Sequence, residues 1–101
     1  MNNQADLNRV AKKLHECLPA LKKKYPIASM ALFGSIVRED FDPAKSDVDI
    51  LVEFNGRIGI EFMDLAVELE EMIGRKIDLV STGGLKKPWW KEHILNQAVY
   101  V

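Results

Sequence analysis

The sequence predicts an α/β (α+β) domain in which helices lie against a small sheet. Two observations support this fold class. In two long segments, apolar residues recur every three or four positions, which is the spacing of an amphipathic helix. Between and after these segments lie short runs rich in β-branched residues and bounded by turn residues, which is typical of strands. The expected order, helix–strand–strand–helix–strand–helix, indicates a layered domain.

A first helix is expected over residues 7–21, because apolar residues at helical spacing form one face of this segment. Pro19 lies late in the segment and is expected to kink or shorten the last turn, since proline has no backbone N–H to donate. The apolar face consists of Leu7, Val10, Ala11, Leu14, Cys17, Leu18 and Leu21.

A second helix is expected over residues 60–73, and Gly74 is a natural stop for it. Glu68, Glu70 and Glu71 are interpreted as its solvated face. A last helix is expected over about residues 85–97, with Pro88 in its first turn, where proline is tolerated. The apolar side of the second helix consists of Phe62, Leu65, Ala66, Leu69, Met72 and Ile73.

Three strands are expected over residues 27–33, 47–54 and 76–81, and a final short strand over 98–101. The first stops at Gly34-Ser35, and a polar segment with a proline, residues 39–46, reads as a loop. Side chains alternate between the two faces of a strand, so the apolar face of the second strand can be predicted. It consists of Val48, Ile50, Val52 and Phe54.

At 101 residues, the whole chain, 1–101, is expected to be a single domain. The formal net charge is −1, from 14 basic and 15 acidic residues, so direct nucleic-acid binding is not expected. No apolar run approaches the ~18 residues of a membrane helix, and the polar N-terminus does not resemble a signal peptide. We therefore expect a cytoplasmic protein that does not bind membranes.

Two aspartates at the start of the second strand are the most informative residues. Asp47 and Asp49 are two positions apart, so their carboxylates share one face. Adjacent carboxylates repel each other unless a cation lies between them, and Mg²⁺ is commonly held by one or two carboxylates together with substrate phosphates. Asp78 in the third strand joins this face if the two strands pair in a suitable register. Three convergent carboxylates suit a two-metal site.

An apolar strand that runs into a glycine and a serine precedes these aspartates. Gly34 allows the backbone to approach a phosphate closely, and Ser35 adds a hydroxyl. Exposed N–H groups at the start of a helix attract anions. Together with the aspartates, this arrangement predicts a site for a magnesium nucleoside triphosphate.

From about residue 27 to the C-terminus, the chain resembles the minimal nucleotidyltransferases (MNT) of the DNA polymerase β superfamily. The resemblance rests on Phe33-Gly34-Ser35, on Ser46-Asp47-Val48-Asp49 and on Ile77-Asp78-Leu79. It implies a polymerase β-like fold with a small mixed sheet. It also implies that Gly34 and Ser35 hold the phosphates of ATP, and that Asp47, Asp49 and Asp78 are catalytic and bind Mg²⁺. Arg38 matches a basic position that can contact the triphosphate, although a surface salt bridge is an equal alternative.

The chain also resembles the antitoxins of HEPN–MNT toxin–antitoxin pairs. The resemblance implies a helical HEPN ribonuclease as partner and transfer of AMP from ATP to a tyrosine hydroxyl of that partner. Two alternatives remain open at this point. The chain could be an antitoxin that inhibits by binding alone, or a nucleotidyltransferase for small molecules that requires a helical partner subunit.

Overall fold

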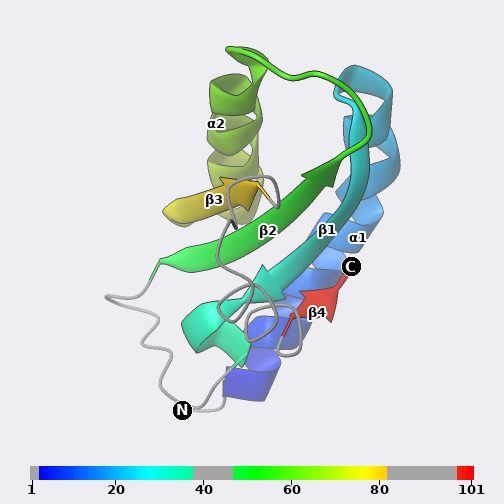
Figure 1. Ribbon diagram of the computed structural model, residues 1–101. Helices are drawn as coiled ribbons and strands as arrows, with labels where there is room; N and C mark the ends of the chain where they lie inside the picture. The colour runs from blue at the N-terminus through cyan, green and yellow to red at the C-terminus, as the bar shows by residue number, and fades with distance from the viewer. Residues whose placement is uncertain (1–2, 38–46, 82–97) are drawn as a thin grey trace, which may run out of the picture.

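The computed structural model describes residues 3–37, 47–81 and 98–101. The predicted helix over residues 85–97 lies outside this part. The described elements, in chain order, are the helix α1 (Asn3–Lys24), the strand β1 (Ile27–Phe33), a short 3-10 helix η1 (Gly34–Val37), β2 (Val48–Phe54), α2 (Glu61–Ile73), β3 (Ile77–Ser81) and β4 (Val99–Tyr100). Figure 1 shows these elements. Every strand predicted from the sequence is present, with ends that differ by no more than about two residues.

The four strands form one mixed sheet in the order β3-β2-β1-β4. β1 pairs antiparallel with β2 and with β4, whereas β2 and β3 are parallel and are joined through α2. A parallel pair needs such a crossover connection, because a tight turn cannot return the chain to the same end of the sheet. The predicted fold class, a small mixed sheet flanked by helices, is confirmed.

Both helices pack on the same face of the sheet. Figure 1 shows α1 and α2 behind the strands. The apolar sides of the two helices and of the strands meet in one core. This agrees with the predicted apolar face of β2, because Val48, Ile50 and Val52 are fully buried. The other central residues of this core are Val10, Leu14, Leu18, Leu21, Met30, Leu32, Leu65 and Leu69.

The opposite face of the sheet carries a second, smaller apolar cluster. Ala31 and Leu51 are buried there, and they are cross-strand neighbours. Val80 of β3 pairs with Leu51 and extends the cluster across the sheet. The same face carries Asp49 and Asp78 toward one end, so it changes from apolar to acidic along the strands.

The first helix is longer than expected, and Pro19 does not shorten it. α1 begins at Asn3 and continues through Pro19 to Lys24. Proline in a helix interior removes one hydrogen bond and costs ~3 kcal/mol. Pro19 itself is exposed, but Leu18 and Leu21 on either side of it are buried in the core. Their burial offsets the missing hydrogen bond, so tertiary packing overrides the local preference.

Both ends of α2 are fixed by hydrogen bonds. At the start, the Gly59 N–H donates to a carboxylate oxygen of Glu61 at 2.9 Å. A hydrogen bond from the backbone of Glu61 itself and then this bond from Gly59 lower the pKa of the Glu61 carboxyl. At the end, Gly74 adopts a left-handed conformation with φ 75°, and its N–H donates to the Glu70 carbonyl at 2.8 Å. Gly74 therefore stops the helix, as predicted.

The glutamates of α2 do not all form a solvated face, so that prediction was wrong in part. The carboxylate of Glu68 accepts hydrogen bonds from Lys24 Nζ and from the Tyr25 hydroxyl, both at 2.5 Å. Glu70 accepts a hydrogen bond from the Ile77 N–H at 3.3 Å. These contacts tie α2 to the end of α1 and to the start of β3, and only Glu71 behaves as expected.

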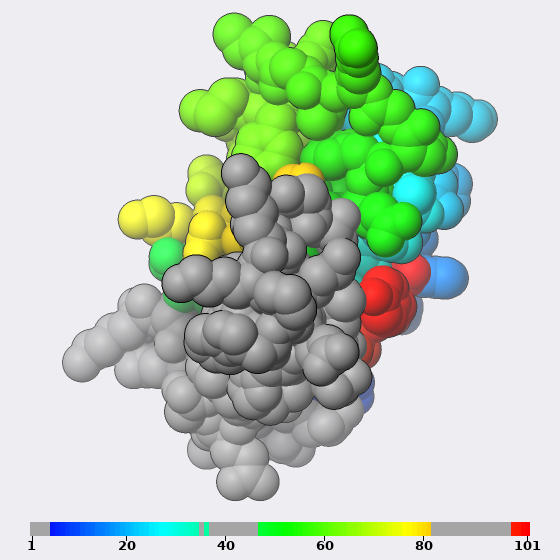
Figure 2. All heavy atoms as spheres, in the orientation of Figure 1, coloured from blue at the N-terminus to red at the C-terminus, as the bar shows by residue number. Residues whose placement is uncertain are grey.

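The outer side of α2 carries an apolar stripe. Ile60, Met63 and Val67 are 80%, 65% and 53% exposed. Figure 2 shows the start of α2 and the segment before it at the upper edge of the molecule. None of the helices in the described part of the chain is long and apolar enough to span a membrane.

Candidate active site

The site begins at Gly34, where β1 ends and η1 starts. Gly34 has φ 74°, a conformation that residues with a Cβ rarely adopt. A Cβ at this position would lie 3.0 Å from Asp49 Cγ and 3.2 Å from Asp49 Cβ. The Asp49 side chain therefore covers the α-carbon of Gly34. Glycine is required here both for its backbone conformation and for this close approach.

Asp49 lies in the middle of a row that crosses three chain segments. It pairs with Phe33 of β1, directly before Gly34, and with Asp78 of β3. Paired residues on adjacent strands point to the same face and are about 4.8 Å apart. Val48 and Ile77, which alternate with the two aspartates, are buried against the helices. Asp49 and Asp78 thus lie side by side on the face of the sheet away from the helices.

Asp47 lies directly before β2 and is exposed. The N–H of Val48, the next residue, donates a 3.0 Å hydrogen bond to the Lys76 carbonyl. This bond fixes the start of β2 beside the start of β3. Among the described residues, no three Asp, Glu, His or Cys side chains lie close enough together to hold a metal ion. Carboxylates repel one another, and only a bound cation favours drawing all three together.

The remaining predicted residues are described only in part. Ser35 is the second residue of η1 and directly follows Gly34. Nothing is described of its side chain. Arg38 lies outside the described residues. The structure thus brings Gly34, Asp49 and Asp78 together. They follow the order of the adjacent strands β1, β2 and β3.

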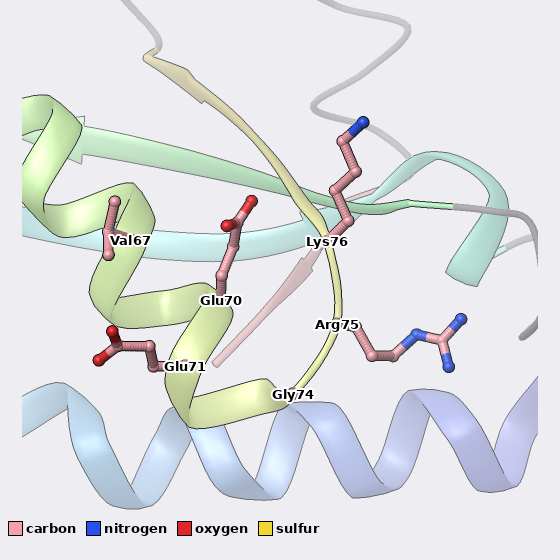
Figure 3. Close-up of a pocket in the computed structure, with 6 residues that line it drawn as sticks. All are labelled: Val67, Glu70, Glu71, Gly74, Arg75 and Lys76. Atoms are coloured by element: carbon pink, nitrogen blue, oxygen red, sulfur yellow. The ribbon is translucent and has the colours of Figure 1, made fainter.

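Lys76 belongs to the same neighbourhood, and the sequence analysis overlooked it. It lies directly before β3 and two positions before Asp78. Figure 3 shows its side chain rising from the sheet on the side away from α1. Its position two residues before Asp78 was visible in the sequence and could have identified it.

The arrangement suits chemistry on a phosphate. Two carboxylates supply the hard oxygen ligands that Mg²⁺ prefers. A glycine in a left-handed turn, followed by a short helix, presents backbone next to them. Acidic residues beside such a turn would repel a polyphosphate that binds alone. They suit a polyphosphate that binds together with a cation.

The comparison with family models agrees with this geometry. Residues 14–101 match the model of the nucleotidyltransferase domain. The matched range contains Gly34, Asp49 and Asp78.

Curated relatives cover most of the chain. A protein of Methanocaldococcus jannaschii that is named among the protein adenylyltransferases is 42% identical over 82 residues, which are 80% of this chain and 83% of the relative. The protein adenylyltransferase MntA of Thermococcus cleftensis is 35% identical over 82 residues, or 80% of this chain and 81% of the relative.

Solved structures show the same fold. One described as a minimal nucleotidyltransferase superposes with a TM-score of 0.70 at 29% identity, covering 98% of this chain and 95% of that one. A chain from the complex of a tri-AMPylated Shewanella oneidensis HEPN toxin with an MNT antitoxin superposes with a TM-score of 0.57 at 21% identity, covering 98% and 71%. At that identity the second likeness shows the fold alone. The family match and the shared fold thus agree, and this chain is a minimal nucleotidyltransferase of the nucleotidyltransferase domain family.

Proposed function

We propose that this chain transfers AMP from Mg-ATP to a hydroxyl, most simply that of a tyrosine, on a cognate HEPN ribonuclease toxin, and thereby acts as its antitoxin. The observation that carries the proposal is the row formed by Gly34, Asp49 and Asp78. Relatives of this chain are named protein adenylyltransferases, which supports a protein as the acceptor. The fold shared with an MNT antitoxin bound to an AMPylated HEPN toxin supports the partner.

The proposed roles of the three aspartates are metal binding and proton acceptance. Asp47 and Asp49, with Asp78, would hold Mg²⁺. The cation would stabilise the negative charge of the triphosphate and the negative charge that develops during transfer. Asp78 is the exposed member of the aspartate pair and lies at the edge of the sheet, which supports it as the group that would accept the proton of the acceptor hydroxyl.

The transfer itself is an in-line displacement. The acceptor oxygen forms a bond to the α-phosphorus while the bond from that phosphorus to the pyrophosphate oxygen breaks. The proton of the acceptor goes to Asp78, and pyrophosphate leaves. Gly34 and Ser35 would hold the β- and γ-phosphates through the backbone at the start of η1, with Arg38 as a further contact. Because ATP and the RNA substrates of a ribonuclease are cytoplasmic, we place the reaction in the cytoplasm.

The proposal is tested by the mass of the partner. A candidate HEPN toxin is incubated with the chain, ATP and Mg²⁺, and its intact mass is measured. We expect a gain of one or more AMP units, and no gain with the Asp47→Asn/Asp49→Asn variant. Glu53→Gln is the matched control, because Glu53 is an exposed carboxylate on the same strand. If neither version changes the mass and both still neutralise the toxin, the chain is an antitoxin that acts by binding. Transfer to a small molecule but not to protein would instead indicate the small-molecule class.

A further inference from the structure

The side of the site on which the acceptor must lie follows from the strand order. Gly34 follows β1 on one side of Asp49, and Asp78 belongs to β3 on the other. In an in-line displacement, the attacking and leaving oxygens lie on opposite sides of the phosphorus. If the proposed function holds and the β- and γ-phosphates lie at Gly34, the acceptor oxygen approaches from the side of β3.

Lys76 is a cation on that side. It is exposed, and its backbone is fixed by the hydrogen bond from the Val48 N–H to its carbonyl, 3.0 Å long. It lies two positions before Asp78, and its carbonyl is bonded to the residue that directly follows Asp47. Within the described part of the chain, its ammonium group forms no ion pair or side-chain hydrogen bond. It is therefore available to a bound group.

The surface next to Lys76 leaves room for an acceptor carried on another protein. β3 lies at one edge of the sheet. A hollow of about 440 Å³ adjoins it at the turn from α2 to β3. Figure 3 shows the lining residues, with Lys76 on the open face and Glu70 and Glu71 on α2. As far as the described residues go, a segment of a partner can therefore reach Lys76 from the β3 edge of the sheet.

We propose that Lys76 binds the acceptor rather than the triphosphate, and that its ammonium group stabilises the negative charge that develops on the acceptor oxygen as its proton leaves. This rests on the proposed function and adds a residue to it. A fixed positive charge beside a developing oxyanion lowers the barrier most where water is excluded, as beneath a docked partner. The lysine keeps its proton throughout, and the acceptor proton still goes to Asp78.

The test measures the single-turnover rate of AMP transfer to the HEPN partner at saturating ATP, together with ATP binding. For Lys76→Met we expect a rate about 100-fold lower, the size typical of removing one preorganised charge, with unchanged ATP affinity. Lys76→Arg should restore most of the rate. Lys22→Met is the matched control, because Lys22 is an exposed lysine at the far end of α1.

A second measurement distinguishes this role from a merely structural one. When the acceptor tyrosine is replaced by a difluorotyrosine, whose phenol ionises more easily, the rate of Lys76→Met should recover more than that of the wild type. Three results would overturn the proposal: a wild-type rate for Lys76→Met, a loss confined to ATP affinity, or equal effects of fluorination on both proteins. A wild-type chain that transfers no AMP at all would overturn the proposed function itself, and the two failures are thus distinct.

Discussion

The Asp49 carboxylate lies directly over the α-carbon of Gly34, where a Cβ would meet Asp49 Cγ at 3.0 Å. Two distant points of the sequence thus form one contact at the end of β1. The contact couples the glycine turn to the aspartate that is proposed to bind the metal. A change at Gly34 should therefore disturb both the backbone and the position of Asp49.

Gly34→Ala should lower the free energy of unfolding and reduce both ATP binding and transfer, because the new Cβ displaces Asp49. Gly74→Ala is the matched control: its φ is 75°, but a Cβ there meets no atom within 4 Å. The control should therefore lose only about 1–2 kcal/mol from the left-handed conformation and keep its activity. Denaturant unfolding and ATP titration of both variants measure the two effects. Equal ATP binding by both variants would contradict the proposed contact between the turn and the site.

Asp78→Asn should slow AMP transfer about 10²–10⁴-fold, the usual contribution of a positioned general base. ATP binding should persist, since Asp49 remains in place beside Gly34. The measurement is the transfer rate at saturating ATP, with Glu53→Gln, an exposed carboxylate of β2, as the control. A full rate for Asp78→Asn would assign proton removal to another group.

Because of the hydrogen bond between Tyr25 and Glu68, the free energy of unfolding should fall at alkaline pH. The hydrogen bond to the Glu68 carboxylate raises the pKa of Tyr25 from 10.0 to about 12. Because the folded pKa is higher than the unfolded one, this stabilisation is present below pH 10.0 and is lost as the pH rises to about 12. Tyr25→Phe should lower the free energy of unfolding by about 1–2 kcal/mol at pH 7 and flatten the alkaline decline. Urea unfolding across this range tests it, with the exposed Tyr100→Phe as the control.

The hydrogen bonds of Glu68 with Lys24 and Tyr25 should also make the free energy of unfolding fall at acid pH. The Lys24 ammonium group and then the Tyr25 hydroxyl lower the pKa of Glu68 below its usual 4.5. A lowered folded pKa gives stability that is present above pH 4.5 and is lost as the pH falls through the folded value. Glu68→Gln should therefore flatten the acid limb of the stability curve, while Glu71→Gln, at an exposed position, should leave it unchanged. A steep acid limb in both variants would locate the acid sensitivity elsewhere.

Pro19→Ala should stabilise the protein. Pro19 is exposed in the interior of α1, so alanine restores a backbone hydrogen bond without disturbing the core. We expect a gain of about 1–3 kcal/mol in the free energy of unfolding. Ala20→Gly, at the adjacent exposed position, should lose about 1 kcal/mol and shows that the assay responds to helix propensity. A destabilised Pro19→Ala variant would mean that the helix needs the proline geometry.

Much of the fold could be predicted from the sequence, because the signals are local. Helical spacing identified α2 to within one residue at its start, and alternation placed Val48 and Asp49 on opposite faces of β2. The end of α1 could not be predicted in this way. Proline argues against a helix beyond Pro19, whereas burial of Leu21 in the core favours it, and burial was the stronger effect.

By itself, the sequence determined which residues are proposed to carry the chemistry and which of them share a strand face, since both inferences depend on neighbours within a few positions. Only the tertiary structure decided that Asp78 pairs with Asp49, that Asp49 covers Gly34, and that Lys76 lies on the β3 side of the site. These relationships depend on strand order and register. Register is set by how the apolar faces of β1, β2 and β3 fill one core with α1 and α2, and a shift by one residue would turn every aspartate to the other face of the sheet.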